Sequence, residues 1–155
     1  MTTRREFLIA AGVAFAVSAE AQLPANIEAL RKEALQEALR KVTGGAPLRR
    51  GRVKLDIPPL IDNGNSVSLS VTVDSAMTPV DYVKAIHVFT EKNPQPYVLS
   101  AYFGPRAGRA AVTTRCRIAD TGTVIVIAQT SDGAFWTDSA QVVVTLSACL
   151  EDGLI

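Results

Sequence analysis

The one histidine and the two cysteines of the sequence are the side chains considered first for covalent or acid–base chemistry: His87, Cys116 and Cys149. Because His87 is the only histidine, a zinc site built from several imidazoles is excluded, and neither cysteine is spaced as a nearby co-ligand. The glycines form no phosphate-binding or dinucleotide-binding motif. We therefore expect no metal and no cofactor. A lone histidine in a strand is more often a structural residue than a general base, so an enzyme that uses His87 is the weakest hypothesis.

The two cysteines differ in the direction that strand alternation gives them, since neighbouring side chains in a strand point to opposite faces. In the strand expected over residues 109–118, Cys116 shares its face with apolar residues, whereas arginines occupy the other face. In the strand expected over residues 139–148, the even-numbered residues form the apolar face. Cys149 belongs to the opposite, mixed face and is therefore the thiol that a partner could reach.

A disulfide between Cys116 and Cys149 is the alternative arrangement, and it would suit an exported protein. One sulfur directed into the core and one directed away from it cannot meet unless the backbone breaks the strand alternation. We therefore expect Cys116 to be a small buried apolar residue and Cys149 to be a separate thiol.

The N-terminus has the composition of a twin-arginine export signal. Arg4-Arg5 precedes an apolar run from Phe7 to Ala19, and the segment ends in the small-residue sequence Ala19-Glu20-Ala21. The run is shorter than the roughly 20 residues that span the hydrocarbon core of a bilayer. We therefore expect residues 1–21 to be a signal removed on export, a mature protein in the periplasm, and no membrane anchor.

The mature chain is expected to be close to neutral. Residues 1–21 carry two arginines and two glutamates, so their removal leaves the formal net charge at +1. A nearly neutral protein has no general electrostatic attraction to nucleic acid or to an anionic bilayer. Neither is therefore expected as a partner.

An amphipathic helix is expected between the signal and the rest of the chain. From Ala25 to Lys41, apolar residues recur at intervals of three and four among charged ones. The segment Thr43-Gly44-Gly45-Ala46-Pro47 then favours a turn that ends the helix. We assign residues 22–50 to this helix and its linker, and residues 51–155 to a β-sandwich domain with a short C-terminal tail.

From Val53 onward the apolar period changes to two, which is typical of half-buried strands. Turn signals rich in glycine, proline and asparagine separate the segments. About seven strands are expected, over residues 53–57, 67–73, 82–89, 97–103, 109–118, 123–130 and 139–148. With no helix between them to form parallel crossovers, they predict an all-β, immunoglobulin-like antiparallel sandwich. Phe135 and Trp136 are expected to cap its core.

Several longer segments resemble one protein family. They are VKLDIPP (53–59), DNGNSV (62–67), VTVDS (71–75), HVFTEKNPQP (87–96), FGPRAGRA (103–110), TTR (113–115), SDGAFW (131–136) and VVTL (143–146). Together they run over almost the whole mature chain. In these segments the chain resembles SoxY, the sulfur-carrier subunit of the bacterial Sox thiosulfate-oxidising system.

The resemblance implies a carrier protein rather than an enzyme. Proteins of this family pair with a small β-sandwich subunit, SoxZ, and hold substrate on a cysteine near the C-terminus. A Sox haem enzyme couples thiosulfate oxidatively to that cysteine, and a thiosulfohydrolase then trims the attached group. The family's apolar strand matches Val143 to Leu146, which places the attachment position on Cys149.

The residues around Cys149 depart from the family's Gly-Gly-Cys-Gly-Gly ending. Ser147 and Ala148 replace the preceding glycines, and Leu150 and Glu151 follow the cysteine. Glycines make an arm thin and conformationally free, whereas nearby carboxylates disfavour the thiolate and repel thiosulfate. The alternative hypothesis is therefore a protein-interaction subunit whose sandwich binds partners and whose cysteine is not used.

A loop with two arginines is the remaining candidate contact. Arg106 and Arg109 lie in the segment FGPRAGR, where they could dock a partner or guide a sulfur oxyanion. The alternative is a solvated turn, since short exposed loops often carry such charges.

Overall fold

The computed structural model describes residues 23–146 of the chain. The expected signal, residues 1–21, and Cys149 lie outside these residues. Within them the chain forms one helix, α1 (Leu23–Thr43), followed by nine strands. The strands are β1 (Leu48–Arg49), β2 (Val53–Asp56), β3 (Leu60–Ile61), β4 (Val67–Val73), β5 (Val83–Thr90), β6 (Tyr97–Tyr102), β7 (Ala110–Cys116), β8 (Gly122–Thr130) and β9 (Phe135–Val144).

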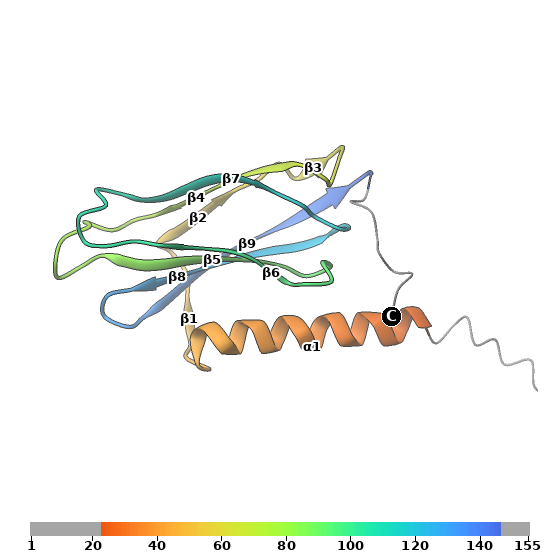
Figure 1. Ribbon diagram of the computed structural model, residues 1–155, viewed down its shortest axis with the longest axis horizontal. Helices are drawn as coiled ribbons and strands as arrows, with labels where there is room; N and C mark the ends of the chain where they lie inside the picture. Colours follow the sequence, from red (N-terminus) through yellow and green to blue (C-terminus); the bar gives the residue numbers. More distant parts are fainter. Residues whose placement is uncertain (1–22, 147–155) are drawn as a thin grey trace, which may run out of the picture.

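The strands form two sheets that stack on each other, and α1 runs along the outside of the larger one (Figure 1). The larger sheet has the order β1-β9-β8-β5-β6, with β3 also paired to β9, and the smaller has the order β2-β4-β7. Neighbouring strands are antiparallel, except that the two-residue strands β1 and β3 run parallel to β9. The expected all-β, immunoglobulin-like sandwich is confirmed.

The seven expected strands correspond to β2 and to β4 through β9. The prediction missed β1 and β3, because segments of two residues are too short to show alternation. β1 and β3 form because each pairs with the edge of β9 that β8 does not occupy.

The last strand begins at Phe135 rather than at Ser139 and ends at Val144. It begins early because the β8–β9 turn is tight: Gly133 has a φ of 84°, and the Thr130 N–H donates to Ala134 O at 3.0 Å. Because the first half of β9 contains polar residues, its sequence does not show the alternation of apolar and polar side chains that is typical of a strand. Phe135 belongs to this strand and is buried between the larger sheet and α1, so it fills a core there.

The main core lies between the two sheets. β4 alternates buried and exposed residues, as expected of a strand with one face in solvent. β5 is buried at every position but one, because the smaller sheet covers one of its faces and α1 covers part of the other. The central strand is thus the most protected part of the fold.

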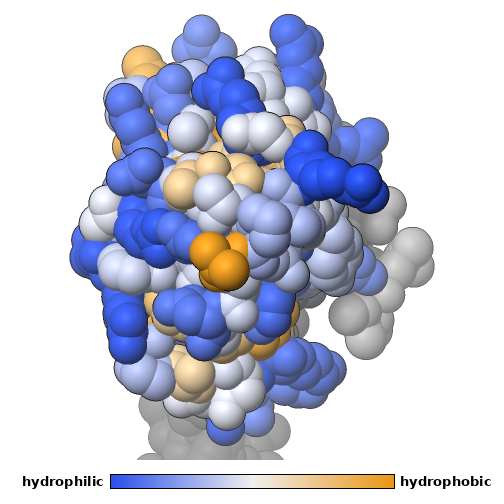
Figure 2. Space-filling view, turned by 90° about the vertical axis from the view of Figure 1, so that its left-hand side faces the viewer, coloured by the Kyte–Doolittle hydropathy of each residue, from blue (hydrophilic) through white to orange (hydrophobic). Residues whose placement is uncertain are grey.

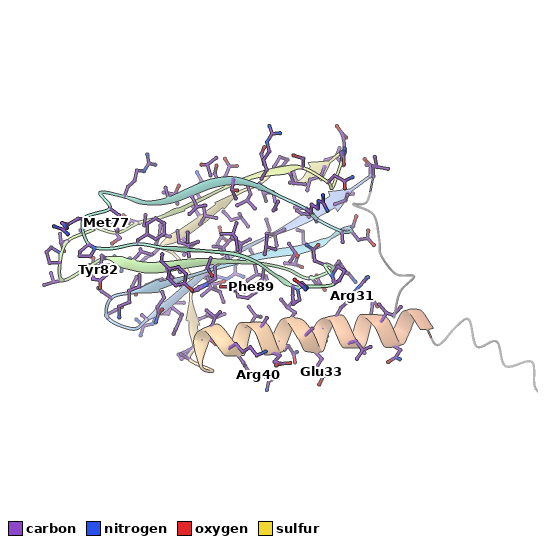
Figure 3. All side chains as sticks on the ribbon, in the orientation of Figure 1. Arg31, Glu33, Arg40, Met77, Tyr82 and Phe89 are labelled. Carbon is purple, nitrogen blue, oxygen red and sulfur yellow. The ribbon has the colours of Figure 1, made fainter. Side chains whose placement is uncertain are left out.

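A second, smaller core joins α1 to the larger sheet. Leu35 packs against Phe89, Ile127 and Phe135. Figure 3 shows Phe89 in the layer between sheet and helix, while the labelled Glu33 lies on the helix face turned away from the sheet. The helix is therefore amphipathic in the way that its spacing predicts.

α1 extends from Leu23 to Thr43, slightly beyond the expected range of 25–41. The residue after its end is Gly44, whose φ of 61° lies in the left-handed region and whose N–H donates to Arg40 O at 2.8 Å. The end of the helix is therefore set by the expected glycine turn. Among the described residues, no helix is both long and apolar enough to cross a membrane.

Leu35→Ala should destabilise the protein by about 2–3 kcal/mol, because it removes a buried leucine from the small core and leaves a cavity. Urea unfolding followed by circular dichroism measures this loss. Leu30→Ala is the matched control, since Leu30 lies on the same helix but is 57% exposed. The control should change the free energy of unfolding by less than about 0.5 kcal/mol. Equal losses in the two variants would contradict the packing of α1 described here.

Candidate functional site

The last described residues follow β9, whose end pairs with β3 (Figure 1). The Thr145 N–H donates to Ile61 O at 2.9 Å, and the Gly64 N–H donates to Leu146 O at 2.8 Å. We call residues 143–146 the C-terminal root. Because these bonds hold it, Leu146 is the fixed point from which the chain continues toward Cys149.

Cys149 lies outside the described residues, three positions beyond Leu146. A fully extended chain spans at most about 3.6 Å per residue, so the Cα atom of Cys149 stays within about 11 Å of that of Leu146. Its thiol is therefore confined to the neighbourhood of the C-terminal root, whatever conformation the residues between them adopt.

The C-terminal root is also bonded to the β7–β8 connection. Gly64 O accepts a hydrogen bond from the Ile118 N–H at 2.8 Å, and Thr121 Oγ1 accepts one from the Val144 N–H at 2.9 Å. Asn93, in the β5–β6 loop, adds side-chain hydrogen bonds to the backbone of the same connection. Hydrogen bonds thus connect several loops with one another and with the C-terminal root.

Cys116, at the end of β7, is half-buried and packs against the main core. Burial raises the pKa of its thiol, which keeps the group protonated and weakly nucleophilic. Ile118, two residues later, is bonded to Gly64 beside the C-terminal root, so Cys116 lies at the end of the sandwich to which Cys149 is tethered. The inward position of Cys116, rather than distance, is therefore what argues against a disulfide between the two cysteines.

Arg106 and Arg109 are exposed in the β6–β7 loop, at the opposite end of the sandwich. The Phe103 N–H donates to Lys84 O at 2.9 Å, which places this loop beside the start of β5. The start of β5 pairs with the end of β8, and the start of β8 pairs with the end of β9. The length of β8, on the order of 30 Å, separates the two ends. The structure therefore does not bring these arginines together with Cys149 of the same chain.

His87 is buried in β5, with 5% of its surface exposed. Its Nδ1 atom lies 3.0 Å from Tyr97 Oη and 2.8 Å from Ser100 Oγ, so hydroxyl groups satisfy it. Burial lowers the pKa of the imidazole from 6.5, which favours the neutral form in the folded protein. These features are those of the structural histidine that the sequence predicts. Among residues 23–146, no three His, Cys, Asp or Glu side chains gather as metal ligands.

Sequence analysis missed an exposed apolar cluster at the C-terminal root. Leu60, Val143 and Leu146 are 59%, 51% and 59% exposed. The predicted inward position of Leu146 is wrong, because β9 ends at Val144 and the alternation does not continue to Leu146. The signal that could have revealed the cluster is the run of valines at 142–144, since one of three consecutive valines must face away from the core.

These features define a class of protein: an immunoglobulin-like β-sandwich with a fixed root for a cysteine-bearing C-terminal segment. The family model of the sulfur oxidation protein SoxY matches residues 39–149. The chain therefore belongs to the SoxY family, which confirms the resemblance seen in its segments. The matched range ends at Cys149.

Solved structures show the same fold. The sulfur carrier protein SoxY from Chlorobium limicola f thiosulfatophilum superposes with a TM-score of 0.62 at 24% identity, over 76% of this chain and 96% of that one. A superoxide reductase (neelaredoxin) from Ignicoccus hospitalis has a TM-score of 0.55 at 14% identity, over 61% of this chain and 80% of that one. At these identities the likeness shows the fold alone. A search of curated proteins gave no match.

The buried His87 should make stability depend on pH. Its folded-state pKa is lowered from 6.5, so below that pH the unfolded chain binds a proton that the folded chain resists. Stability should be full above pH 6.5 and should fall as the pH decreases, by up to about 1.4 kcal/mol per pH unit. Urea unfolding at pH 7.5 and 5.5 measures this loss, which His87→Gln should reduce. An unchanged pH dependence in His87→Gln would contradict the prediction.

Proposed function

We propose that this protein is a periplasmic sulfur carrier of thiosulfate oxidation that holds sulfur intermediates covalently on Cys149. The observation that carries the proposal is membership of the SoxY family, over a matched range that ends at Cys149. Family membership supports a Sox sulfur-carrier role and a protein that is acted on rather than an enzyme. The C-terminal root adds support, because a carrier needs its thiol to leave the folded core at a defined point.

The chemistry at Cys149 is the making and breaking of bonds to sulfur. Oxidative coupling joins its sulfur to the outer sulfur of thiosulfate, releases the thiol proton, and passes two electrons to a Sox haem enzyme. A thiosulfohydrolase then uses water to cleave the bond to the sulfonate group. That group leaves as sulfate with two protons, and one added sulfur remains on Cys149. The carrier supplies the thiol and its position, while its partners supply the catalysis.

In this proposal Cys116 is a structural residue and Cys149 carries the chemistry. Cys116 is half-buried, and the raised pKa of its thiol keeps it protonated, so it competes poorly for an electrophilic sulfur. Cys149 follows the root by three residues, at the position that the family resemblance gives to the attachment cysteine. Loading is therefore directed to Cys149.

The partner subunit in this proposal is a SoxZ-like β-sandwich, and the two are exported together. The twin-arginine route carries folded proteins, so the signal on this chain would also take out a bound subunit that has no signal of its own. Arg106 and Arg109 remain available for such a subunit, because they are exposed at the end of the sandwich away from the C-terminal root.

The second candidate function is a protein-interaction subunit whose cysteine is not used. The observation that favours it is the loss of the family's glycines around Cys149, where Leu150, Glu151 and Asp152 follow the sulfur. Bulk and negative charge at these positions hinder entry into a narrow site and repel an anionic substrate. The two functions differ in whether sulfur is found on the protein.

Intact mass of the protein, purified without reductant from cells that oxidise thiosulfate, tests the carrier function. We expect adducts of added sulfur or thiosulfonate on the native chain and none on Cys149→Ser. Cys116→Ser is the matched control, and it should keep the adducts because the Cys116 thiol is half-buried and protonated. An unmodified native chain would favour the interaction subunit, whereas adducts that persist in Cys149→Ser would contradict Cys149 as the attachment residue.

A further inference from the structure

The connection between β3 and β4 contains an asparagine followed by a glycine, Asn63-Gly64. In such a pair the glycine nitrogen can attack the side-chain amide of the asparagine, because glycine has no Cβ atom to obstruct the approach. The bond from Gly64 N to Asn63 Cγ forms as the glycine nitrogen loses its proton, and the amide nitrogen gains a proton and leaves as ammonia. Water then opens the resulting succinimide ring to an aspartate or an isoaspartate. No oxidant or cofactor takes part.

The neighbouring Asn65 activates the carbonyl group that is attacked. Its backbone N–H and its Nδ2–H both donate to Asn63 Oδ1, at 2.9 Å and 3.1 Å. When the Gly64 nitrogen attacks Cγ, negative charge develops on this oxygen, and the two donors stabilise that charge as an oxyanion hole does. Asn63 is also exposed, so water reaches it and ammonia can leave. The surroundings of the Asn63 side chain therefore favour the reaction.

The C-terminal root restrains the attacking nitrogen. The Gly64 N–H donates to Leu146 O at 2.8 Å, and Gly64 O accepts a hydrogen bond from the Ile118 N–H at 2.8 Å, so both sides of this buried glycine are held. The hydrogen in the bond to Leu146 is the one that the nitrogen must lose when the ring closes. Ring closure therefore requires that the bond between Gly64 and Leu146 breaks first.

We propose that Asn63 is a latent modification site that the C-terminal root controls. While the root is closed, the hydrogen bond between Gly64 and Leu146 suppresses formation of the succinimide. When the root opens, the Gly64 nitrogen is released and Asn63 loses its amide group. The site is independent of the proposed carrier function, because every residue that takes part belongs to the described sandwich and none of them is Cys149.

Modification of Asn63 and closure of the root exclude each other. In the succinimide the Gly64 nitrogen carries no hydrogen, so it cannot donate to Leu146 O. In an isoaspartate the backbone runs through the side chain of position 63, and the extra carbon atom displaces Gly64 relative to Leu146. Because closure of the root disfavours the ring, the ring disfavours closure of the root by linkage. The modified protein should therefore have a loosened root.

Two control sites are present in the same chain. Asn93 precedes Pro94, whose nitrogen carries no hydrogen and therefore cannot close the ring. Asp132-Gly133 can form the same ring by loss of water, but the Gly133 N–H donates to Thr130 O at 3.0 Å within its own hairpin turn. This turn is at the end of the molecule that faces the viewer in Figure 2, away from β3, where the surface is mainly hydrophilic. Isomerisation of Asp132 thus reports reactivity that does not depend on the root.

The experiment loosens the root and leaves the reacting residues unchanged. Thr145→Pro removes the N–H that donates to Ile61 O at 2.9 Å and the hydroxyl that donates to Asp62 O at 3.1 Å. Thr137→Val is the matched control, because it removes a hydroxyl that donates to Val126 O near the other end of β9. Circular dichroism verifies that each variant folds.

The measured quantity is the rate at which each site reacts. The purified proteins are incubated at neutral pH with and without denaturant. Peptide mapping by mass spectrometry then gives the rate at which Asn63 loses its amide group, the rate at which Asp132 isomerises, and the background at Asn93. Opening of the root is fast relative to ring closure, so the rate at Asn63 follows the population of molecules with an open root.

We expect Asn63 to react at least about tenfold more slowly in the folded native chain than in the unfolded chain. Folded Thr145→Pro should react about two- to tenfold faster than the folded native chain, which is the change in open population that follows from the loss of one backbone hydrogen bond. Thr137→Val should react at the native rate. Asp132 should isomerise at the same rate in all three folded proteins.

Several results would overturn the proposal. One is a folded native chain in which Asn63 reacts as fast as in the unfolded chain, and another is an unfolded chain in which it reacts no faster than Asn93. A folded Thr145→Pro that reacts at the native rate, or in which Asp132 accelerates together with Asn63, would also overturn control by the root. If Thr145→Pro fails to fold, Thr145→Val is compared with Thr137→Val, and equal rates at Asn63 would overturn the proposal.

Hydrogen exchange tests the reciprocal effect of the modification on the root. Protein that carries the modification at Asn63 is separated from the native form by ion exchange, since the new carboxylate changes its charge. The backbone N–H groups of Val143 and Thr145, which donate to Pro59 O and Ile61 O, should exchange faster in the modified form. The amides of β5 should stay as protected as in the native form. Equal protection of Thr145 in the two forms would contradict mutual exclusion.

Discussion

The pairing of β9 with strands on both of its edges is the constraint on which the rest of the structure depends. On one edge β9 forms the antiparallel hairpin with β8, and on the other it takes β1 at its start and β3 near its end. Its first residue, Phe135, belongs to the small core beneath α1. Its last residues continue into the C-terminal root. One strand therefore fixes both the helix and the point from which the cysteine-bearing segment departs.

The same strand connects the two sheets. The Leu55 N–H of β2 donates to Asp138 Oδ2 of β9 at 2.9 Å. In the sequence, the polar Asp138 weakens the prediction of a strand at this position. In the structure its carboxylate accepts a hydrogen bond from the edge strand of the facing sheet. Because that bond satisfies an edge N–H, it also protects β2 from pairing with another chain.

The parts of the fold that sequence analysis predicts are those that depend on local pattern. The alternation in β4 and the glycines after α1 act within a few residues, and both features have the expected positions. The start of β9, the strands β1 and β3, and the exposure of Leu60 depend on which distant segments pair. The distance between Arg106 and the C-terminal root likewise follows from the strand order. No single-sequence pattern contains these relations, because they arise only when the sheets assemble.

The candidate site also has features that the sequence predicts and features that depend on the tertiary structure. Residue type and family resemblance point to Cys149, and strand alternation places Cys116 inward, in agreement with its half-buried position. Neither indicates that the chain around Leu146 is fastened by backbone hydrogen bonds. The fixed root is a tertiary feature, and it turns a cysteine near a chain end into a cysteine held within a bounded region.

That bounded region has a kinetic consequence. A thiol three residues from a fixed point samples a small volume, so its effective concentration toward a protein bound at that point is high, at least in the millimolar range of short flexible linkers. The chemical step then needs little help from a tight complex. Weak contacts dissociate quickly. In the proposed carrier function the protein must leave one enzyme before it meets the next, so a short tether and a brief encounter would serve it better than strong binding.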